Sequence, residues 1–339
     1  MGFDIARGTN ISHWLSQSKR RGAERRAFFT RDDVQRIAGY GFDHIRLPID
    51  EEQMFAASGE PEGEAFELLE SALGWCAEAR LRAVVDLHIL RSHHFLDADP
   101  PLYTDPAEAE RFAELWRVLS ERLDHRPVDQ VAYELLNEPV AHDAAQWNRV
   151  ARQAYQAVRE REPGRVIVLG SNRFQSVDTF DELDVPADDP AMMLSLHYYR
   201  PMAVTHYRAS WTQRRDYAGP IQYPGQPVPD AALAQVKDAA LRQVIEQDNK
   251  PVDSQTMARD LAQPLAKREA TGLKLYCGEF GCVHHTPMEI RLRWYRDFVS
   301  VLEEHAIAWA NWDYKGSFGI VDSDGRDTGI AAALMGART

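Results

Sequence analysis

The stretch AYELLNEPV, residues 132–140, joins a run of mostly apolar residues to an abrupt polar end. Its first part, through Leu136, is nearly continuously apolar rather than alternating, which is typical of a parallel strand covered on both faces. Pro139 cannot donate to a strand ladder, so the strand must end near Asn137 and Glu138. The stretch therefore predicts a buried strand that delivers two polar side chains at its carboxyl end.

Short apolar runs of this kind recur along the chain. The expected strands are Asp4–Arg7, His44–Leu47, Ala83–Leu87, Val131–Leu136, Val166–Leu169, Met192–Leu196, Leu273–Cys277 and Ile307–Asn311. Eight strands are the number that closes a parallel sheet on itself when helices connect them. The pattern therefore predicts a (β/α)8 TIM barrel.

Amphipathic helical patterns lie between the expected strands. Thr30 and Asp33 form a capping box that is expected to begin the first helix, which Gly39 or Gly41 would end. The tryptophans in these patterns are interpreted as packing residues. Four longer helices are expected over 66–76, 112–123, 147–158 and 292–302, each with apolar residues on one face.

The chain of 339 residues is expected to form a single catalytic domain over 1–339, because barrels with insertions often reach this length. Residues 198–250 form one long insertion after the sixth strand. The insertion contains Tyr207, Trp211, Tyr217 and Tyr223, so it is too aromatic for a disordered segment, and its tyrosines are candidates to extend a sugar platform.

Composition excludes several classes of partner. The formal charge is −13 and the pI is about 5.4, so no nucleic-acid or membrane partner is expected. The basic run 19–26 is interpreted as a solvated loop and helix start. Three cysteines argue against a disulfide framework. Because no export segment follows Met1, we expect a cytoplasmic chain as written, or a secreted or periplasmic one if a leader was removed.

Polar and aromatic residues gather where the expected strands end. In a parallel barrel these positions line the active-site mouth. The residues are Asn10, His13, Trp14, Arg46, Asp86, His88, Asn137, Glu138, Ser171, Asn172, His197, Tyr199, Glu279, Asn311, Trp312 and Asp313. Such a concentration predicts an active site at this end of the barrel.

Two carboxylates stand out among these residues, Glu138 after the fourth strand and Glu279 after the seventh. A pair of carboxylates facing one cleft suits glycoside hydrolysis, in which one donates a proton to the leaving oxygen and the other attacks the anomeric carbon. Carboxyl groups about 5 Å apart indicate retention of configuration, whereas roughly 6.5 to 9.5 Å indicates inversion.

The motifs at the strand ends resemble those of glycoside hydrolase family 5, the cellulase and mannanase family of retaining barrel enzymes. The matching motifs, in the family's order, are GFDHIRLP, VVDLH, LLNEP, SLHYY, YCGEFG and WANWDYKG. One NEP alone would be weak evidence. Six motifs at the expected strand ends make the resemblance specific.

The resemblance implies that Glu138 is the acid/base and Glu279 the nucleophile. It implies that Arg46 orients Glu279 and that Tyr199 donates to it. A cation and a phenol beside Glu279 favour its ionised form, and partial desolvation of Glu138 near another carboxylate raises its pKa, as a proton donor requires.

The resemblance also implies four substrate-binding roles. Asn137 would bind the sugar 2-hydroxyl, His88 and His197 would line the subsite beside the cleaved bond, and Trp312 would stack beneath the sugar. Flat aromatic faces suit the C–H faces of pyranose rings.

The expected function is a retaining glycoside hydrolase that cleaves β-1,4-glucan or its oligosaccharides by double displacement, with endo action. A β-1,3-glucanase, a β-mannanase and an exo-acting β-glucosidase remain alternatives on the same fold. A carbohydrate-binding barrel without catalysis is a further alternative. The stretch DLHILRSHHF, with Arg91, His93 and His94, departs from the family pattern and leaves endo or exo action open. The oligomeric state is also left open.

No cofactor and no metal are expected. His93–His94 and His284–His285, with Cys277 and Cys282, invite a zinc interpretation, but the sequence lacks His-Glu-x-x-His and a paired Cys-x-x-Cys. Asp322–Asp327 is interpreted as a polar turn rather than a calcium loop. Two further acids are interpreted as supporting residues: Glu134 points into the barrel layers or pairs with an internal arginine, and Asp86 is the partner of His88 or Arg46.

Overall fold

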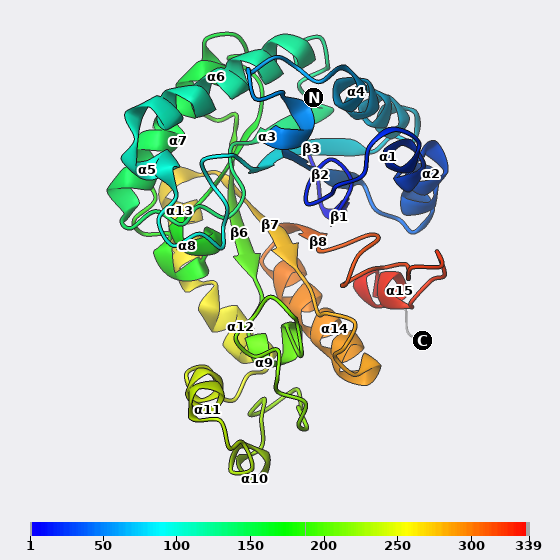
Figure 1. The fold of residues 1–339 in the computed structure, drawn as a ribbon, viewed down its shortest axis with the longest axis vertical. Coiled ribbons are helices and arrows are strands. Elements are labelled where there is room, and N and C mark those ends of the chain that lie inside the picture. Colours follow the sequence, from blue (N-terminus) through cyan, green and yellow to red (C-terminus); the bar gives the residue numbers. More distant parts are fainter. Residues whose placement is uncertain (1, 187, 337–339) are drawn as a thin grey trace. The chain divides into compact units, whose positions relative to one another are not determined.

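The computed structural model describes residues 2–186 and 188–336 (Figure 1). The chain forms two compact units, each described by itself below. The barrel unit contains Met1–His197, Gln263–Gly278 and Ala308–Ala310. The second unit contains Tyr198–Ala262, Glu279–Ile307 and Asn311–Thr339. The prediction of one catalytic domain over 1–339 stays a prediction.

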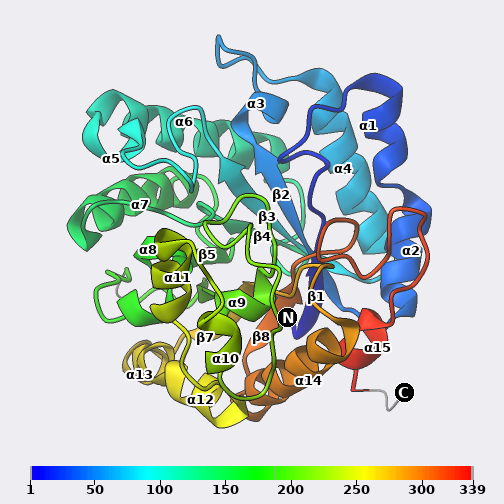
Figure 2. The same cartoon turned by 60° about the horizontal axis from the view of Figure 1, so that its bottom comes forward.

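The strands form a closed parallel barrel in the order β1 to β8, which confirms the predicted fold class (Figure 2). Nearly all strand residues belong to the barrel unit. The strands are β1 (Arg7–Asn10), β2 (His44–Asp50), β3 (Arg82–Ile89), β4 (Val131–Glu134), β5 (Ile167–Gly170), β6 (Met192–Tyr198), β7 (Lys274–Phe280) and β8 (Ala308–Asn311).

Helices connect the strands, as the sequence pattern predicts. In the barrel unit they are α1 (Gly22–Phe28), α2 (Arg31–Gly39), α3 (Glu51–Met54), α4 (Gly63–Glu78), α5 (Pro101–Thr104), α6 (Pro106–Leu123), α7 (Ala144–Arg159), α8 (Asn172–Gln175), the 3₁₀ turn η1 (Val177–Thr179) and α13 (Ala262–Thr271). In the second unit they are α9 (Met202–Thr205), α10 (Asp230–Leu233), α11 (Ala239–Glu246), α12 (Ser254–Asp260), α14 (Met288–Glu304) and α15 (Ile330–Leu334).

The four longer predicted helices are present as α4, α6, α7 and α14. The capping box also forms, because the backbone N–H of Thr30 donates to Asp33 at 2.9 Å where α2 begins. Trp116, Trp147 and Trp294 are almost fully buried on these helices, so they are packing residues as predicted. Among the described residues, no helix combines the length and the apolar character that crossing a membrane requires.

The first strand was predicted three residues too early. Asp4–Arg7 was expected, but the ladder with β2 begins with Gly8 opposite His44. The reason is that the backbone N–H groups of Ala6 and Arg7 donate to the carboxylate of Asp43, at 3.0 to 3.1 Å, instead of to a strand. Phe3 and Ile5, which gave the apolar signal, are buried in the barrel core.

The basic run 19–26 is only partly solvated, which corrects the interpretation of it as an exposed segment. Arg25 on α1 is fully buried, and its guanidinium donates to Glu62 and Glu64 at 3.0 Å. The backbone carbonyl of Arg25 also accepts the indole N–H of Trp14 at 2.8 Å. This arginine is therefore part of the packing between α1 and the start of α4.

The insertion 198–250 has a small apolar core of its own. Ala203, Tyr217, Val228 and Ile245 are buried together. Tyr217 and Tyr223 are 5% and 7% exposed, so these two tyrosines pack internally and do not extend a sugar platform. The insertion is therefore folded, as its aromatic composition predicts.

Candidate active site

Arg46 on β2 is the cation at the centre of a buried polar network in the barrel unit. Its guanidinium donates to the two oxygens of Glu134 at 2.6 and 3.2 Å and lies 3.0 Å from Asp86. It also donates to the side-chain oxygens of Asn10 and Asn137, at 2.9 and 3.0 Å. All five side chains are buried. The predictions that Glu134 pairs with an internal arginine and that Asp86 supports Arg46 are confirmed.

His88 at the end of β3 is held from both sides of its ring. Its Nδ1 lies 2.7 Å from Asp86 Oδ2, and its Nε2 lies 3.3 Å from the amide nitrogen of Gln17. Since the Gln17 amide donates, His88 accepts at Nε2 and donates to Asp86 from Nδ1. Burial raises the pKa of Asp86 to about 7, although Arg46 opposes this rise. Asp86 and Gln17 therefore fix the ring orientation of His88. Asp86 was predicted as a partner from the sequence, whereas Gln17 was not identified.

Asn137 and Glu138 follow β4 as predicted. The backbone N–H of Asn137 donates to the carbonyl of Leu87 on β3 at 3.1 Å, so chain pairing continues beyond the last strand residue. Glu138 then has φ of 44°, a left-handed backbone that non-glycine residues rarely adopt. This turn of the backbone sets the direction of the Glu138 side chain.

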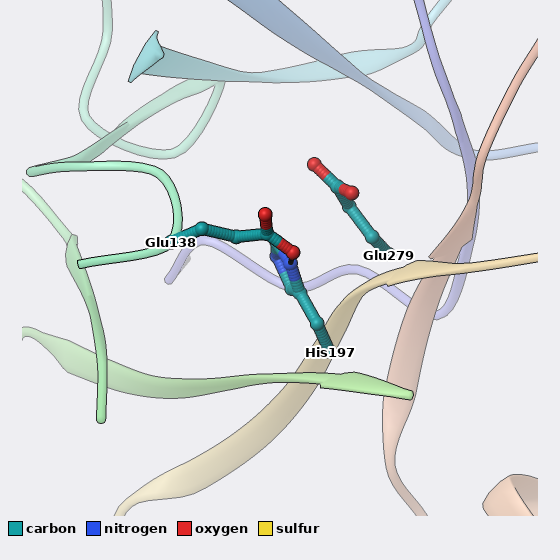
Figure 3. A group of neighbouring side chains, drawn as sticks. All are labelled: Glu138, His197 and Glu279. Atoms are coloured by element: carbon teal, nitrogen blue, oxygen red, sulfur yellow. Dashed lines mark hydrogen bonds and ion pairs between the residues drawn. The ribbon is translucent and has the colours of Figure 1, made fainter. Parts of the chain in front are cut away.

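The carboxylate of Glu138 lies against His197, which comes from β6 (Figure 3). Glu138 Oε1 and His197 Nδ1 are 3.0 Å apart. Burial lowers the pKa of His197 well below its ordinary value, and the positive charge of Arg46 and the ring of His88 add to this effect. His197 is therefore neutral, and its Nδ1–H donates to Glu138 when the carboxylate is ionised.

Glu279 and Tyr199 meet in the second unit. The phenol Oη of Tyr199 donates to Glu279 Oε2 at 2.9 Å, which is the hydrogen bond that the sequence predicted. Glu279 is 5% exposed and lies at the carboxyl end of β7, and Figure 3 labels its side chain. A hydrogen bond to the charged form of a carboxyl group favours ionisation. The phenol therefore helps Glu279 to remain an anion.

Trp312 follows β8 in the second unit and is 7% exposed. It packs in a cluster with Val283 and Phe318, and Tyr199 lies against the same cluster. Its backbone N–H donates to the carbonyl of Phe280 at 2.8 Å. The indole is thus held on the same side of the unit as the phenol that contacts Glu279.

His93 is a buried brace rather than a contact at the end of a cleft. Its Nε2 lies 3.1 Å from the carbonyl oxygen of Asn137, and its Nδ1 lies 3.0 Å from the hydroxyl of Tyr103. Burial lowers the pKa of His93 to about 3, although its bond to Asn137 opposes this. Of its neighbours, Arg91 pairs with Glu51 at 2.8 Å and His94 stacks on Phe95 at 4.6 Å. Arg91 and His93 thus have internal partners.

Sequence reasoning missed Gln175, which also contacts the Glu138 loop. The backbone N–H of Glu138 donates to its side-chain oxygen at 3.3 Å, and its amide nitrogen donates to Glu134 at 2.9 Å. Gln175 lies five residues beyond the end of β5, in a short polar segment without periodicity. No pattern in that segment marks it, because only the folded turn brings it back to the strand end.

Few of the described residues are arranged to bind a metal ion. Three described residues each offer one potential ligand atom: Glu138 and His197 of the barrel unit and Glu279 of the second unit. In the second unit, His284 Nδ1 lies 2.9 Å from the carbonyl of Ser317, and burial raises the pKa of the Cys282 thiol. A thiol that stays protonated is a poor metal ligand.

Comparison with known proteins identifies the family of this chain. Residues 7–317 match the family model described as Cellulase (glycosyl hydrolase family 5). The chain belongs to glycosyl hydrolase family 5. It is accordingly an O-glycosyl hydrolase with a TIM barrel, as the strand-end motifs predicted.

Two curated proteins are similar to this chain over most of their length. Endoglucanase C of Acetivibrio thermocellus is 32% identical over 313 residues, covering 91% of this chain and 90% of that protein. Cellodextrinase A of Ruminococcus flavefaciens is 28% identical over 309 residues, covering 90% and 84%. The solved endoglucanase Cel5A of Thermotoga maritima superposes with a TM-score of 0.78 at 21% identity, covering 97% of this chain and 96% of that one. The last likeness concerns the fold.

Proposed function

We propose that this family 5 glycoside hydrolase cleaves internal glycosidic bonds of β-1,4-glucan or its oligosaccharides and retains the anomeric configuration. The observation that carries the proposal is the pair of carboxylates at the carboxyl ends of β4 and β7, Glu138 and Glu279. The carboxyl ends of all strands in a parallel barrel meet at one mouth. The likeness to Endoglucanase C supports the choice of substrate and of endo action.

In the first step, Glu279 attacks the anomeric carbon while Glu138 donates its proton to the leaving glycosidic oxygen. The bond to the leaving sugar breaks, and an ester between Glu279 and the remaining sugar forms. Tyr199 supports this step by holding Glu279 as an anion through its 2.9 Å hydrogen bond. A carboxylate is the form that has the electron pair for attack.

In the second step, Glu138 removes a proton from water, and the water oxygen displaces Glu279 from the sugar. Two inversions at one carbon give net retention. His197 supports this step, because its Nδ1–H donates to the ionised form of Glu138 that acts as the base. The same imidazole lies beside Glu138 both when Glu138 is protonated and when it is ionised.

The remaining site residues are proposed to bind the sugar. Asn137, whose oxygen is occupied by Arg46, has its amide N–H groups for the 2-hydroxyl. Its orientation is fixed by that guanidinium. His88 and His197 would line the subsite beside the cleaved bond, and Trp312 would stack on the pyranose ring. Arg46 would orient two residues, Asn137 and the nucleophile Glu279.

The alternatives that share this chemistry are a β-1,3-glucan substrate, a β-mannan substrate and exo action on a β-glucoside. A relative named probable glucan 1,3-beta-glucosidase A, from Aspergillus fumigatus, is 27% identical but covers only 59% of this chain. A carbohydrate-binding barrel without catalysis is disfavoured because relatives named as glycosidases match most of the chain.

The test is reducing-end release from soluble β-1,4-glucan, β-1,3-glucan, mixed-linkage glucan and β-mannan by the wild type and by Glu279→Gln. We expect activity on the β-1,4 substrates, a rapid fall in viscosity that indicates internal cleavage, and loss of turnover in the variant. Proton NMR of the first product formed should show the β anomer. Full activity of Glu279→Gln would contradict the assignment of the nucleophile.

A further inference from the structure

Gln175 is a fully buried polar side chain beside the loop that carries Glu138. Its amide nitrogen donates to Glu134 Oε1 at 2.9 Å, and its amide oxygen accepts the backbone N–H of Glu138 at 3.3 Å. Glu134 is in turn the partner of Arg46. The amide of Gln175 therefore links the backbone of the acid/base to the buried ion pair at the centre of the barrel unit.

The backbone that presents Gln175 is strained. After β5 ends, Arg173, Phe174 and Gln175 have φ of 56°, 66° and 53°, so three successive non-glycine residues adopt the left-handed region. Each such residue costs on the order of 1 kcal/mol or more, and it persists only where its surroundings hold it. The turn is therefore maintained by contacts made elsewhere.

Those contacts go to the loop that follows Glu138. The side-chain oxygen of Asn172 accepts the N–H of Ala141 at 3.0 Å, and its amide nitrogen donates to the carbonyl of Ala141 at 3.0 Å. The N–H of Phe174 donates to the carbonyl of Pro139 at 3.1 Å. The turn after β5 and the loop after β4 are thus hydrogen-bonded together along their length.

Two further features show that the site is shaped around Gln175. A Cβ atom at Gly170 would lie 2.2 Å from the amide nitrogen of Gln175, so only glycine leaves room for this side chain at the end of β5. Glu138 itself has φ of 44° and precedes a proline, which restricts its backbone further. The bond from Gln175 to the Glu138 N–H therefore acts on a strained residue.

We propose that Gln175 is a positioning residue that fixes the backbone of Glu138 and so aims its carboxyl group at the leaving oxygen. The proposal rests on the proposed function, in which Glu138 is the acid/base. It assigns Gln175 no contact with substrate. Its removal should weaken proton donation while leaving nucleophilic attack by Glu279 intact.

Proton donation is measured by dependence on the leaving group. A 2,4-dinitrophenyl leaving group departs without a proton, whereas the sugar alcohol of an oligosaccharide needs one. The quantity kcat/KM reports the steps up to formation of the glycosyl-enzyme. A misplaced acid therefore lowers kcat/KM for cello-oligosaccharides far more than for 2,4-dinitrophenyl β-cellobioside.

For Gln175→Ala we expect kcat/KM on cellotetraose to fall by about 10²-fold, the lower range for general acid catalysis. On the dinitrophenyl substrate we expect a change within about threefold. Val177→Ala is the matched control, because Val177 is buried on the same segment and its side chain has no polar atom to bond the Glu138 backbone. It should lower the two activities equally or not at all.

Gln175→Glu gives a second test that does not depend on tolerance of a cavity. A protonated Glu at this position keeps an oxygen for the Glu138 N–H and an O–H for Glu134. Once ionised, it loses that O–H and repels Glu134. The activity of Gln175→Glu on oligosaccharides should therefore stay within about threefold of wild type at acid pH. As pH rises, its activity should begin to fall at a lower pH than the activity of wild type does.

Glu138→Ala separates failure of this inference from failure of the proposed function. If Glu138→Ala shows the leaving-group dependence and both Gln175 variants keep wild-type ratios and pH profiles, the positioning role is overturned while the acid/base assignment stands. If Glu138→Ala itself shows no such dependence, the proposed function fails first. Equal losses on both substrates for Gln175→Ala would also overturn the positioning role.

Discussion

Nδ1 of His197 lies 3.0 Å from Oε1 of Glu138, within the barrel unit and beside the buried cation of Arg46. The imidazole is kept neutral by burial. It therefore supplies one hydrogen-bond donor to a carboxyl group that must be protonated in one step and ionised in the next. This relationship predicts how the pH profile depends on His197.

Replacement of His197 by Ala should raise the pKa of Glu138, because it removes a donor that favours the charged form. The basic limb of kcat/KM should therefore move to higher pH, while the rate of the second step falls. Measurement of kcat/KM from pH 4 to 10 on a cello-oligosaccharide checks this. A basic limb that moves to lower pH would show that the imidazole does not stabilise the carboxylate.

Tyr199→Phe should shift the acid limb of the pH profile rather than the basic limb. Loss of the phenol removes the 2.9 Å hydrogen bond to Glu279, so the pKa of Glu279 rises and the acid limb moves to higher pH. Hydrogen bonds to charged groups contribute about 1.5 to 3 kcal/mol, so kcat/KM should fall by roughly 10- to 100-fold. An unchanged acid limb with an unchanged rate would contradict the role of the phenol.

Asp50→Asn should stabilise the protein increasingly as pH rises. Burial raises the pKa of Asp50 from 3.8 to about 7, although the backbone N–H of Gln17 donates to its carboxylate at 2.6 Å. Above pH 4 the unfolded chain releases this proton while the folded chain retains it, so wild-type stability declines until about pH 7. The variant avoids that decline, with a gain of up to about 4 kcal/mol above pH 7. Chemical denaturation at pH 4 and pH 8 measures the difference.

Glu51→Gln is the matched control with the opposite sign. Burial would raise the pKa of Glu51, but the Arg91 backbone N–H and the guanidinium groups of Arg111 and Arg91 together lower it. The carboxylate therefore contributes stability above its unfolded pKa of about 4.5, and this is lost as pH falls through the folded value. Glu51→Gln should thus be destabilised at pH 8 and approach wild type in acid. The same trend in both variants would contradict the two pKa assignments.

His93→Phe should destabilise the loop after β4. It leaves the carbonyl of Asn137 and the hydroxyl of Tyr103 buried without the partners that they have at 3.1 and 3.0 Å. Each unsatisfied group costs about 1 to 3 kcal/mol, so the thermal midpoint should fall by several degrees. Tyr103→Phe removes the bond to His93 and also the bond that the Tyr103 hydroxyl accepts from the backbone N–H of Val140 at 3.1 Å, so it too should lower the thermal midpoint. Equal midpoints for wild type and His93→Phe would contradict the bracing role.

Positions marked by a local sequence pattern could be predicted from the sequence. Contacts that form only when the folded chain brings distant residues together could not. The apolar runs identified eight strands because parallel barrel strands are buried on both faces. The first run was misplaced because Phe3 and Ile5 are apolar as core residues outside the ladder. Arg25 was taken as solvated because a basic run does not show which arginine finds buried carboxylates.

The same distinction applies to the candidate site. Glu138, Glu279 and Tyr199 lie at or near the carboxyl ends of β4, β7 and β6, so apolar runs in the sequence were enough to place them. Gln175 reaches the Glu138 loop only because three left-handed residues reverse the chain after β5. Non-glycine residues in that conformation have no sequence signature, so this contact had to be found in the folded structure.

The most direct test of the central claim is identification of the side chain that becomes bonded to the sugar. Incubation with 2,4-dinitrophenyl 2-deoxy-2-fluoro-β-cellobioside should trap the glycosyl-enzyme, because the fluorine slows its hydrolysis more than its formation. Mass spectrometry of the digested protein should then find one added fluorocellobiosyl group, on Glu279. A label on any other residue, or turnover of natural glucan with no label trapped, would contradict a double displacement through Glu279.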